Sequence, residues 1–267
     1  MAHAQGFVVC TVILLRRPDH AWPLLLAANR DERLDRAWDP PAAHWPQHPN
    51  VTGGRDRSGG GTWMALDTTT GVVAAVLNRP GSLGPAPGKR SRGVLPLLAL
   101  AHRTAADAAR HLETALPAGE WRPFNMVVAD SRMAFFLRGL GHGRPQALAL
   151  HTGITMVTSH DPNDLTHPRI RRHLPRFTAA PPPDPDHPDG WRDWEALLAD
   201  DGFDPAVGIA ETLRVPPRGG FGTVSSSLVA LGADGTLHWR FAAGPPGEAP
   251  FERVALKGRA REFNREF

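Results

Sequence analysis

The order in which strand and helix patterns follow one another is the feature of this sequence that most restricts its fold. Four strand patterns come first, two helical stretches follow, four more strands come next, and about two helices precede a last group of two or three strands. The strand patterns lie at about 7–15, 23–28, 62–66, 72–77, 124–129, 133–137, 147–150, 154–158, 223–231, 237–241 and 251–256. Runs of strands that alternate with runs of helices exclude a parallel doubly wound sheet and favour antiparallel sheets with helices packed outside.

Several of these strands are apolar on both faces, as is usual for strands that lie between two other layers. Two antiparallel sheets stacked between two helix layers meet this requirement, so the predicted fold is α+β, a four-layer αββα sandwich. We expect residues 10–267 to form a single domain and residues 1–9 to be an N-terminal extension. The predicted irregular segments are 38–49, the Gly-rich loop 53–61 and the basic Pro/Gly loop 81–93. Helices are expected directly after that basic loop, at 104–116 with Thr104 as N-cap and Asp107 three residues on, at 169–176, at 191–200 and near 206–213.

Composition and charge exclude several classes of protein. The net charge is only +3 and the arginines are scattered, which argues against nucleic-acid binding. No apolar run approaches the roughly 20 residues of a membrane-spanning helix. A single cysteine rules out an internal disulfide framework and favours a cytoplasmic protein. The abundance of Arg, Ala, Gly and Pro, with almost no lysine, indicates a bacterial protein from a GC-rich genome.

Cys10, the only cysteine, lies in the first apolar run and faces a charged strand end. A second apolar run ends abruptly in the polar residues 29–32, and the turn composition between the two runs predicts an antiparallel hairpin. With this hairpin centred on Asp19, Cys10 lies opposite Ala28. The thiol would therefore lie close to the guanidinium and the carboxylate of the polar run.

A thiol in this setting meets the requirements of a nucleophile. The guanidinium of Arg30 would stabilise the thiolate. If Cys10 is the first residue of the mature chain, its α-amine, with a reference pKa of roughly 7.7–8.0, would accept the thiol proton, and Asp31 would hold that amine in place. The alternative is that Cys10 is a small buried side chain of a core strand and that the polar run ends a sheet in solvent.

Further residues are candidates for the same site. Asn78, at the end of a strand, is placed to donate a hydrogen bond to an oxyanion, although it also suits an ordinary turn. Lys89, Arg90 and Arg92 would attract an anionic group of a substrate; the alternative is a basic loop in solvent. The candidate substrate-binding residues are Asn29, Trp63, Arg92, Asn125 and His160. The histidines and acidic residues show no metal-binding spacing, and no metal is expected.

Seven short motifs across the chain resemble one known family. They are Cys10-Thr11-Val12-Ile13-Leu14-Leu15, Leu26-Ala27-Ala28-Asn29-Arg30-Asp31-Glu32, Gly60-Gly61-Thr62-Trp63, Leu77-Asn78, Arg92-Gly93, Phe124-Asn125 and Phe221-Gly222-Thr223. From Cys10 to about Leu237 the chain is similar to the NRDE family, also called the transport and Golgi organization family. That family resembles N-terminal nucleophile hydrolases, which implies an αββα sandwich with a cysteine nucleophile at the mature N-terminus. The resemblance implies Cys10 as nucleophile, Arg30 and Asp31 around it, and Asn78 as oxyanion donor.

This chain departs from the family pattern in three places. Nine residues precede Cys10 where members typically begin Met-Cys, His160 follows Ser159 where an asparagine is common, and Val224 stands where an arginine is frequent. The first departure has a simple explanation if the Val9 codon is a GTG start codon, because removal of the resulting methionine would expose the Cys10 amine. The alternatives are self-cleavage of the bond before Cys10 and a retained extension, which leaves Cys10 without a free amine.

Two functions are consistent with these observations. The first is an N-terminal cysteine amidohydrolase that acts on a non-peptide amide or acyl bond of a small molecule and needs no cofactor. The second is a non-catalytic protein that uses the same fold and pocket to hold haem or a lipid-like ligand, because eukaryotic members of the family are associated with secretory-pathway organisation and with haem or lipid trafficking.

Overall fold

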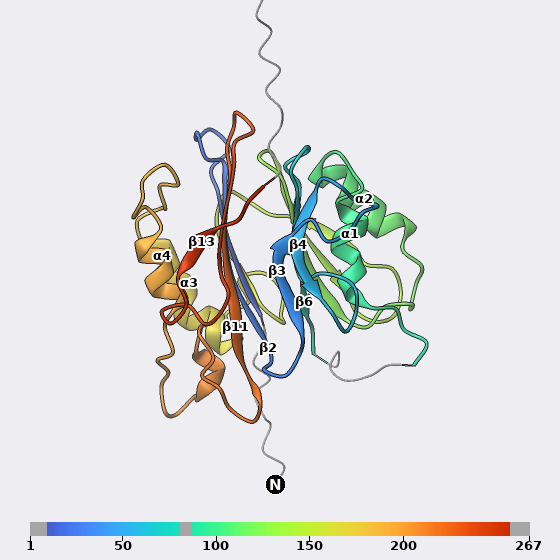
Figure 1. Ribbon diagram of the computed structural model, residues 1–267. Coiled ribbons are helices and arrows are strands. Elements are labelled where there is room, and N and C mark those ends of the chain that lie inside the picture. Colours follow the sequence, from blue (N-terminus) through green and yellow to red (C-terminus); the bar gives the residue numbers. More distant parts are fainter. Residues whose placement is uncertain (1–9, 81–86, 257–267) are drawn as a thin grey trace, which may run out of the picture.

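The computed structural model describes residues 10–80 and 87–256, which form two antiparallel sheets. In spatial order, sheet A consists of β10 (Gly153–Val157), β1 (Thr11–Arg16), β2 (Leu24–Arg33), β11 (Phe221–Leu231), β12 (Leu237–Ala242) and β13 (Phe251–Arg253). Sheet B consists of β3 (Trp38–Ala42), β4 (Val51–Asp56), β5 (Met64–Asp67), β6 (Val73–Asn78), β7 (Phe124–Ala129), β8 (Ala134–Gly139) and β9 (Gln146–Ala149). The two sheets lie face to face (Figure 1).

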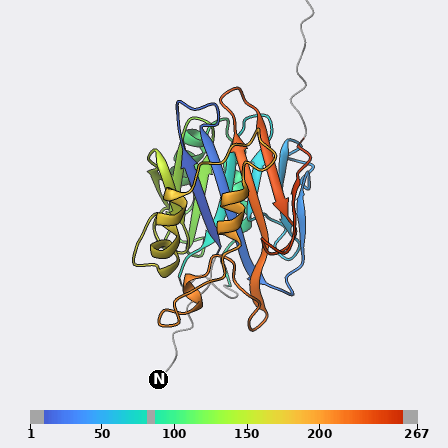
Figure 2. The same cartoon turned by 90° about the vertical axis from the view of Figure 1, so that its left-hand side faces the viewer.

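Helices cover the outer face of each sheet (Figures 1 and 2). Helices α1 (Leu95–Ala99) and α2 (Ala105–Ala115) lie against sheet B, and α3 (Pro168–Ala179) and α4 (Arg192–Leu198) lie against sheet A. Two short 3₁₀ turns, η1 (Arg92–Val94) and η2 (Ile209–Glu211), precede α1 and β11. The predicted α+β fold, an αββα sandwich of antiparallel sheets, is confirmed. None of the helices within the described ranges is long and apolar enough to cross a membrane.

Three clusters of buried side chains correspond to the three interfaces between the layers. In β1, Val12 and Leu14 belong to the cluster between the sheets, whereas Ile13 and Leu15 belong to the cluster beneath α3 and α4. A third cluster lies between sheet B and helices α1 and α2. Alternate residues of a strand point to opposite faces, so strands that are apolar throughout bury both faces. This two-sided burial is the physical basis of the sequence prediction.

The second helix begins as the sequence predicts. The side chain of Thr104 accepts a hydrogen bond from the backbone N–H of Asp107 at 3.1 Å, and α2 follows directly. An N-cap of this kind satisfies one of the N–H groups that a helix leaves without an internal partner.

Two predictions for the segment between the first two hairpins are wrong. The segment 38–49 contains a strand, β3, and the Gly-rich loop predicted at 53–61 begins inside another strand, β4. Glycines are needed in β4 for close packing, because a Cβ on Gly53 would lie 2.5 Å from that of Ala65, and one on Gly54 would lie 2.2 Å from the Trp63 ring. The prolines of β3 are tolerated because β3 is the edge strand of sheet B. The parts of the predictions that fall on residues 7–9 and 81–86 lie outside the described residues.

Candidate active site

The backbone register of sheet A places Cys10 beside Arg30. Strands β1 and β2 pair with Thr11 opposite Asn29, so continuing the ladder by one residue brings Cys10 opposite Arg30. The predicted partner, Ala28, is wrong by two residues. The turn is centred one residue later than predicted, because the backbone N–H of Arg17 bonds to the carbonyl of Pro23 at 2.8 Å. A shift of two residues keeps the same face of the strand, so the thiol and the guanidinium still share one face.

The four polar residues 29–32 are divided between the two faces of sheet A. Asn29 and Asp31 contact elements of the outer helix layer, as their hydrogen bonds to Leu198 and Arg169 indicate. Arg30 and its neighbour Glu32 alternate with them and point to the space between the sheets. One local motif therefore supplies side chains to two different environments.

Cys10 and Arg30 line a small cavity between the two sheets. Its walls also include Trp63 of sheet B and the serines Ser225 and Ser227 of β11, with apolar side chains such as those of Ala28, Ala75 and Leu77. The cavity volume is about 20 Å³, which is room for about one water molecule.

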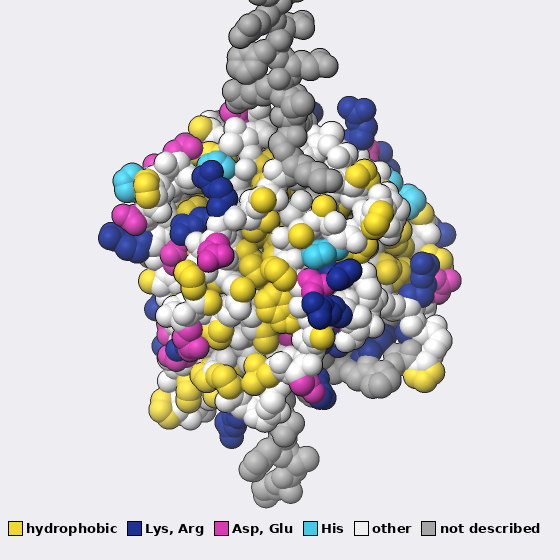
Figure 3. Space-filling model, viewed as in Figure 1, with side chains coloured by type: hydrophobic (Ala, Val, Ile, Leu, Met, Phe, Trp, Pro, Cys, Tyr) yellow, Lys and Arg dark blue, Asp and Glu magenta, His cyan; other side chains and the backbone are white. Residues whose placement is uncertain are grey.

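Hydrophobic side chains gather along the middle of the view in Figure 3, where the two sheets meet. Partly buried apolar side chains that pack against the core between the sheets include Trp38, Trp63, Leu237 and Val254.

Arg30 is held by stacking more than by ion pairing. Its guanidinium carbon lies 4.1 Å from the centre of the Trp63 ring and 5.9 Å from that of Trp38, and its Nη2 lies 3.7 Å from a carboxylate oxygen of Glu32. The side chain is buried, and its Nη1 has no hydrogen-bond partner among the described residues. Burial lowers the pKa of Arg30, while the nearby thiol and carboxylates act in the opposite direction. Gly54 leaves the space that the Trp63 ring occupies.

The thiol of Cys10 is half-buried and is not activated by its neighbours. Its Sγ lies 3.5 Å from the backbone carbonyl oxygen of Asp31. Burial, and after it the Asp31 carboxylate, raises the pKa of the Cys10 thiol to about 12, although Arg30 lowers it in part. At neutral pH such a thiol is ionised in only about one molecule in 10⁵. Nucleophilic chemistry at this position therefore requires a base.

The carboxylate of Asp31 lies in a buried polar cluster on the face of sheet A toward the helices. Its Oδ1 accepts a hydrogen bond from the Thr223 hydroxyl at 2.6 Å, and its Oδ2 accepts one from Nη1 of Arg169 at 3.1 Å. The same Arg169 nitrogen donates to the Thr11 hydroxyl at 2.8 Å. Burial raises the pKa of the Asp31 carboxyl to about 6, and Arg169 and Thr223 oppose that shift. Arg169 and Thr223 lie more than 130 residues from Asp31 along the chain. Neither is a predicted site residue, although Thr223 belongs to one of the family motifs.

Asn29 anchors the outer layer to sheet A. Its amide nitrogen donates to the carbonyl oxygens of Leu198 at 2.9 Å and Leu213 at 3.0 Å, and its amide oxygen accepts a hydrogen bond from the Ser226 hydroxyl. These bonds use both amide hydrogens, so the Asn29 side chain has no donor left for a substrate. The observed contacts of Asn29 are structural.

Asn125 joins sheet B to the loop that follows β10. Its amide nitrogen donates to the carbonyl oxygens of Thr158 at 2.8 Å and His160 at 2.7 Å, and its amide oxygen accepts from Arg79 at 2.7 Å. Continuing the ladder between β1 and β10 by two residues places Ser159 of this loop beside Cys10. The hydroxyl of Ser159 lies 3.0 Å from Nδ1 of His160. The loop therefore reaches the Cys10 end of the sheet, but His160 does not line the cavity.

Asn78 is not brought together with Cys10 by the described contacts. In β6, Ala75 and Leu77 belong to the cluster between the sheets, and Val76 packs toward α1 and α2. The same alternation places Asn78 on the face toward the helices. Asn78 is absent from the described residues that line the cavity, whereas its neighbour Leu77 is present.

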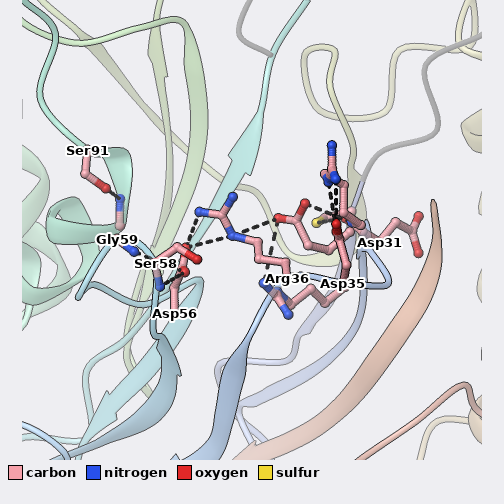
Figure 4. A network of polar contacts seen from close by, with 12 residues as sticks. Asp31, Asp35, Arg36, Asp56, Ser58, Gly59 and Ser91 are labelled. Atoms are coloured by element: carbon pink, nitrogen blue, oxygen red, sulfur yellow. Dashed lines mark hydrogen bonds and ion pairs between the residues drawn. The ribbon is translucent and has the colours of Figure 1, made fainter. Parts of the chain in front are cut away.

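A network of charged side chains lies near Arg30. Arg36 donates from Nε to Asp56 at 3.0 Å and lies 3.6 Å from Glu32, and Asp56 accepts from the backbone N–H groups of Ser58 and Gly59 (Figure 4). Arg36 thus links the Gly-rich loop after β4 to the end of β2.

Arg92, predicted to attract an anion, lies near this group. Its Nη1 donates to the Pro123 carbonyl at 3.0 Å. Burial, and after it the neighbouring Arg122 guanidinium, lowers the pKa of Arg92 to about 10, whereas Cys10 and Glu32 act in the opposite direction. The backbone of Gly93 lies so close to Gly61 that a Cβ on Gly61 would lie 2.4 Å from it. This close approach explains why the Gly-Gly-Thr-Trp and Arg-Gly motifs need their glycines.

Metal-ligating side chains do not gather at this site. Among the residues that the structure describes, no group of three or more His, Cys, Asp or Glu side chains is arranged to hold a metal ion.

Two facing antiparallel sheets between two helix layers, with Cys10 directly before β1, form the four-layer αββα fold that N-terminal nucleophile hydrolases have. A solved structure of the Caenorhabditis elegans ortholog of N-acylethanolamine-hydrolyzing acid amidase matches it with a TM-score of 0.54, over 82% of this chain and 92% of that chain, at 11% sequence identity. The chain belongs to the Transport and Golgi organisation 2 family, whose family model matches residues 9–183. The sequence resemblance to this family is thereby confirmed. A comparison with curated proteins finds no significant match.

Proposed function

We propose that this chain is a cysteine-dependent amidohydrolase that cleaves a non-peptide amide or related acyl bond of a small molecule, with Cys10 as its nucleophile. One observation carries the proposal: the thiol of Cys10 and the buried guanidinium of Arg30 open into the same cavity between the sheets. The fold that the chain shares with an amidase is consistent with this chemistry, although a fold alone does not define a reaction. We place this activity in the bacterial cytoplasm, in keeping with the composition and the single cysteine.

The raised pKa of the thiol makes a local base necessary. With residues 1–9 removed, the α-amine of Cys10 itself is that base, because its ordinary pKa of roughly 7.7–8.0 leaves it largely able to accept a proton near pH 8. Asp31 is the proposed positioning residue for this amine, and Arg30 is the proposed cation that stabilises the thiolate. We therefore propose that the mature protein begins at Cys10.

The proposed reaction has two stages. In the first, Sγ of Cys10 attacks the carbonyl carbon while its proton moves to the α-amine, and the amine leaving group departs with that proton as the C–N bond breaks. In the second, water attacks the resulting thioester, gives its proton to the α-amine, and releases the carboxylic acid as the thiol re-forms. The proposed oxyanion donors are backbone N–H groups near Cys10. Asn78, expected in this role from the sequence, is not proposed for it, because the alternation of β6 turns its side chain toward the helices.

The test compares two forms of the protein in their reaction with para-nitrophenyl acetate. One form begins at Cys10, and the other retains residues 1–9, as verified by intact mass. A positioned general base contributes about 10²–10⁴-fold, so the form that begins at Cys10 should be acylated at least about 100-fold faster, at Cys10. Equal rates for the two forms, or acylation that persists in Cys10→Ala, would refute the proposal.

The second predicted function, binding of haem or a lipid-like ligand, stays a prediction. The cavity beside Cys10, at about 20 Å³, has no room for a macrocycle, so such a ligand would need a rearranged or different site. A haem titration followed by absorbance tests this alternative. Tight binding that survives Cys10→Ala would favour it, and an unchanged spectrum would remove haem.

A further inference from the structure

Two buried polar atoms that face the Cys10 cavity have no hydrogen-bond partner among the residues that the structure describes. They are Nη1 of Arg30, in a side chain that is 6% exposed, and the hydroxyl oxygen of Ser225, which is 1% exposed. Both residues line the cavity, and their backbones are paired directly across β2 and β11. Leaving such groups unpaired is unfavourable for folding. An unpaired donor next to an unpaired hydroxyl indicates a place for an acceptor atom from outside the chain.

A β-bulge directs Ser225 into this place. Thr223 pairs with Asp31 and Ser225 pairs with Arg30, so Val224 is the extra residue of the bulge. In a regular ladder without the bulge, Val224 would lie opposite Arg30 in the place of Ser225. Bulges are frequent beside active sites, where they redirect a side chain.

Two neighbouring hydroxyls of β11 have partners on the opposite face of the sheet. Thr223 donates to Asp31 and Ser226 donates to Asn29, both on the face toward the helices. Ser225 lies between them in the sequence and points to the cavity. Of these three hydroxyls, that of Ser225 is the one without a partner among the described residues.

The buried guanidinium of Arg30 itself favours an anionic acceptor, because its one described ion pair, to Glu32, is long at 3.7 Å. The carboxylates of Glu32 and Asp56 also act on this guanidinium. A second guanidinium, that of Arg92, is electrostatically coupled to Cys10 and lies near a third, that of Arg122. A carboxylate binds a guanidinium and a hydroxyl through charge-assisted hydrogen bonds, which are about twice as strong as neutral ones.

We propose that the substrate of this site carries a carboxylate on its acyl group, bound by Nη1 of Arg30 and the hydroxyl of Ser225. This inference rests on the proposed function. Adjacent strands lie about 4.8 Å apart, so an acceptor beside Arg30 lies about one strand spacing from the Cys10 thiol. That separation matches a carboxylate a few bonds from the scissile carbonyl, as in a succinyl or glutaryl group. At about 20 Å³ the cavity has room for an acceptor oxygen of the carboxylate only, so the rest of the acyl group lies outside it.

The experiment measures kcat/KM of the protein that begins at Cys10 for succinyl-para-nitroanilide and for butyryl-para-nitroanilide, its neutral counterpart of similar length. We expect a preference of about tenfold or more for the succinyl compound, which corresponds to one hydrogen bond to a charged group. Ser225→Ala should reduce this ratio several-fold. Ser227→Ala is the matched control, because it removes a hydroxyl from the same face of the same strand, and it should retain the ratio. Equal kcat/KM values for both compounds would overturn the carboxylate subsite and leave the hydrolase proposal standing.

A binding measurement separates the two proposals if neither compound is cleaved. Calorimetric titration of Cys10→Ala with the same two anilides should show tighter binding of the succinyl compound, and Ser225→Ala in that background should weaken it. Such selective binding without turnover would support the subsite and refute the hydrolase. Equal binding of the two compounds would overturn the subsite.

Discussion

The two faces of sheet A at its Cys10 end carry similar polar residues in contrasting states. On the face toward the helices, Asn29 uses both amide hydrogens within the protein, and both carboxylate oxygens of Asp31 accept hydrogen bonds. On the face toward sheet B, one residue away along the same strands, Arg30 and Ser225 each present a buried polar atom without a partner among the described residues. The comparison suggests a rule for this sheet: side chains whose hydrogen bonds are complete within the protein hold the fold, and those with unpaired atoms are the ones we propose for substrate binding.

The largest expected effect concerns the face toward sheet B. Replacing Cys10 with Ala should abolish acylation by para-nitrophenyl acetate and change the free energy of unfolding by less than about 1 kcal/mol, because the half-buried thiol makes one long hydrogen bond among the described residues. Acylation kinetics and urea denaturation provide the two readouts. A strongly destabilised Cys10→Ala protein would show that this face is structural after all.

The opposite pattern is expected on the face toward the helices. Asn29→Ala removes three buried hydrogen bonds and leaves the carbonyl groups of Leu198 and Leu213 unpaired, so it should lower the free energy of unfolding by about 3 kcal/mol. Urea denaturation measures this loss. A folded Asn29→Ala protein of normal stability that has lost activity would instead place Asn29 among the substrate-binding residues, as the sequence analysis predicts.

Asp31 gives a second test of the comparison. Its ionised carboxylate is buried on the face toward the helices and lowers the stability of the fold there. Folding raises the pKa of its carboxyl from 3.8 to about 6, so the folded protein binds this proton more tightly than the unfolded chain. Protonation of this carboxyl therefore stabilises the fold. That stabilisation is fully present below about pH 4 and is lost as the pH rises through 6, by about 3 kcal/mol in total.

The check is urea unfolding of the wild type and Asp31→Asn across this pH range. The stability of the wild type relative to Asp31→Asn should fall by that amount between about pH 4 and pH 7. A constant or rising difference would contradict a raised pKa.

The smallest effect is expected for Ser225. Because its hydroxyl is buried and unpaired, Ser225→Ala should leave the free energy of unfolding within about 0.5 kcal/mol or raise it slightly. Ser226→Ala is the matched comparison, since it breaks the bond to Asn29 and should destabilise by about 1 kcal/mol. A larger loss for Ser225→Ala than for Ser226→Ala would mean that the two faces do not differ as described.

Local patterns in the sequence were enough to predict the layers and the thiol with its guanidinium. The apolar runs of β1 and β2 are adjacent in the sequence, so their hairpin brings Cys10 and Arg30 together even though the predicted centre of the turn is one residue early. The αββα order follows from strands that are apolar on both faces. The strand β4 escaped prediction because its glycines, which suggest a loop, serve close packing against β5 and Trp63.

The partners contributed by distant segments were not predictable from the sequence. Arg169 lies 138 residues from Asp31 along the chain, and Ser225 reaches Arg30 only through the register of β11 and its bulge. No local pattern marks either residue. Which of the four polar residues 29–32 faces the cavity likewise depends on which sheet face is covered by helices, and only the packed structure shows that.

The central claim is that Cys10 is an N-terminal nucleophile, and intact mass spectrometry of the native protein after treatment with para-nitrophenyl acetate tests it most directly. The account predicts a chain that begins at Cys10 and carries one acetyl group on that residue. A chain that begins at Met1 with Cys10 unmodified would contradict it.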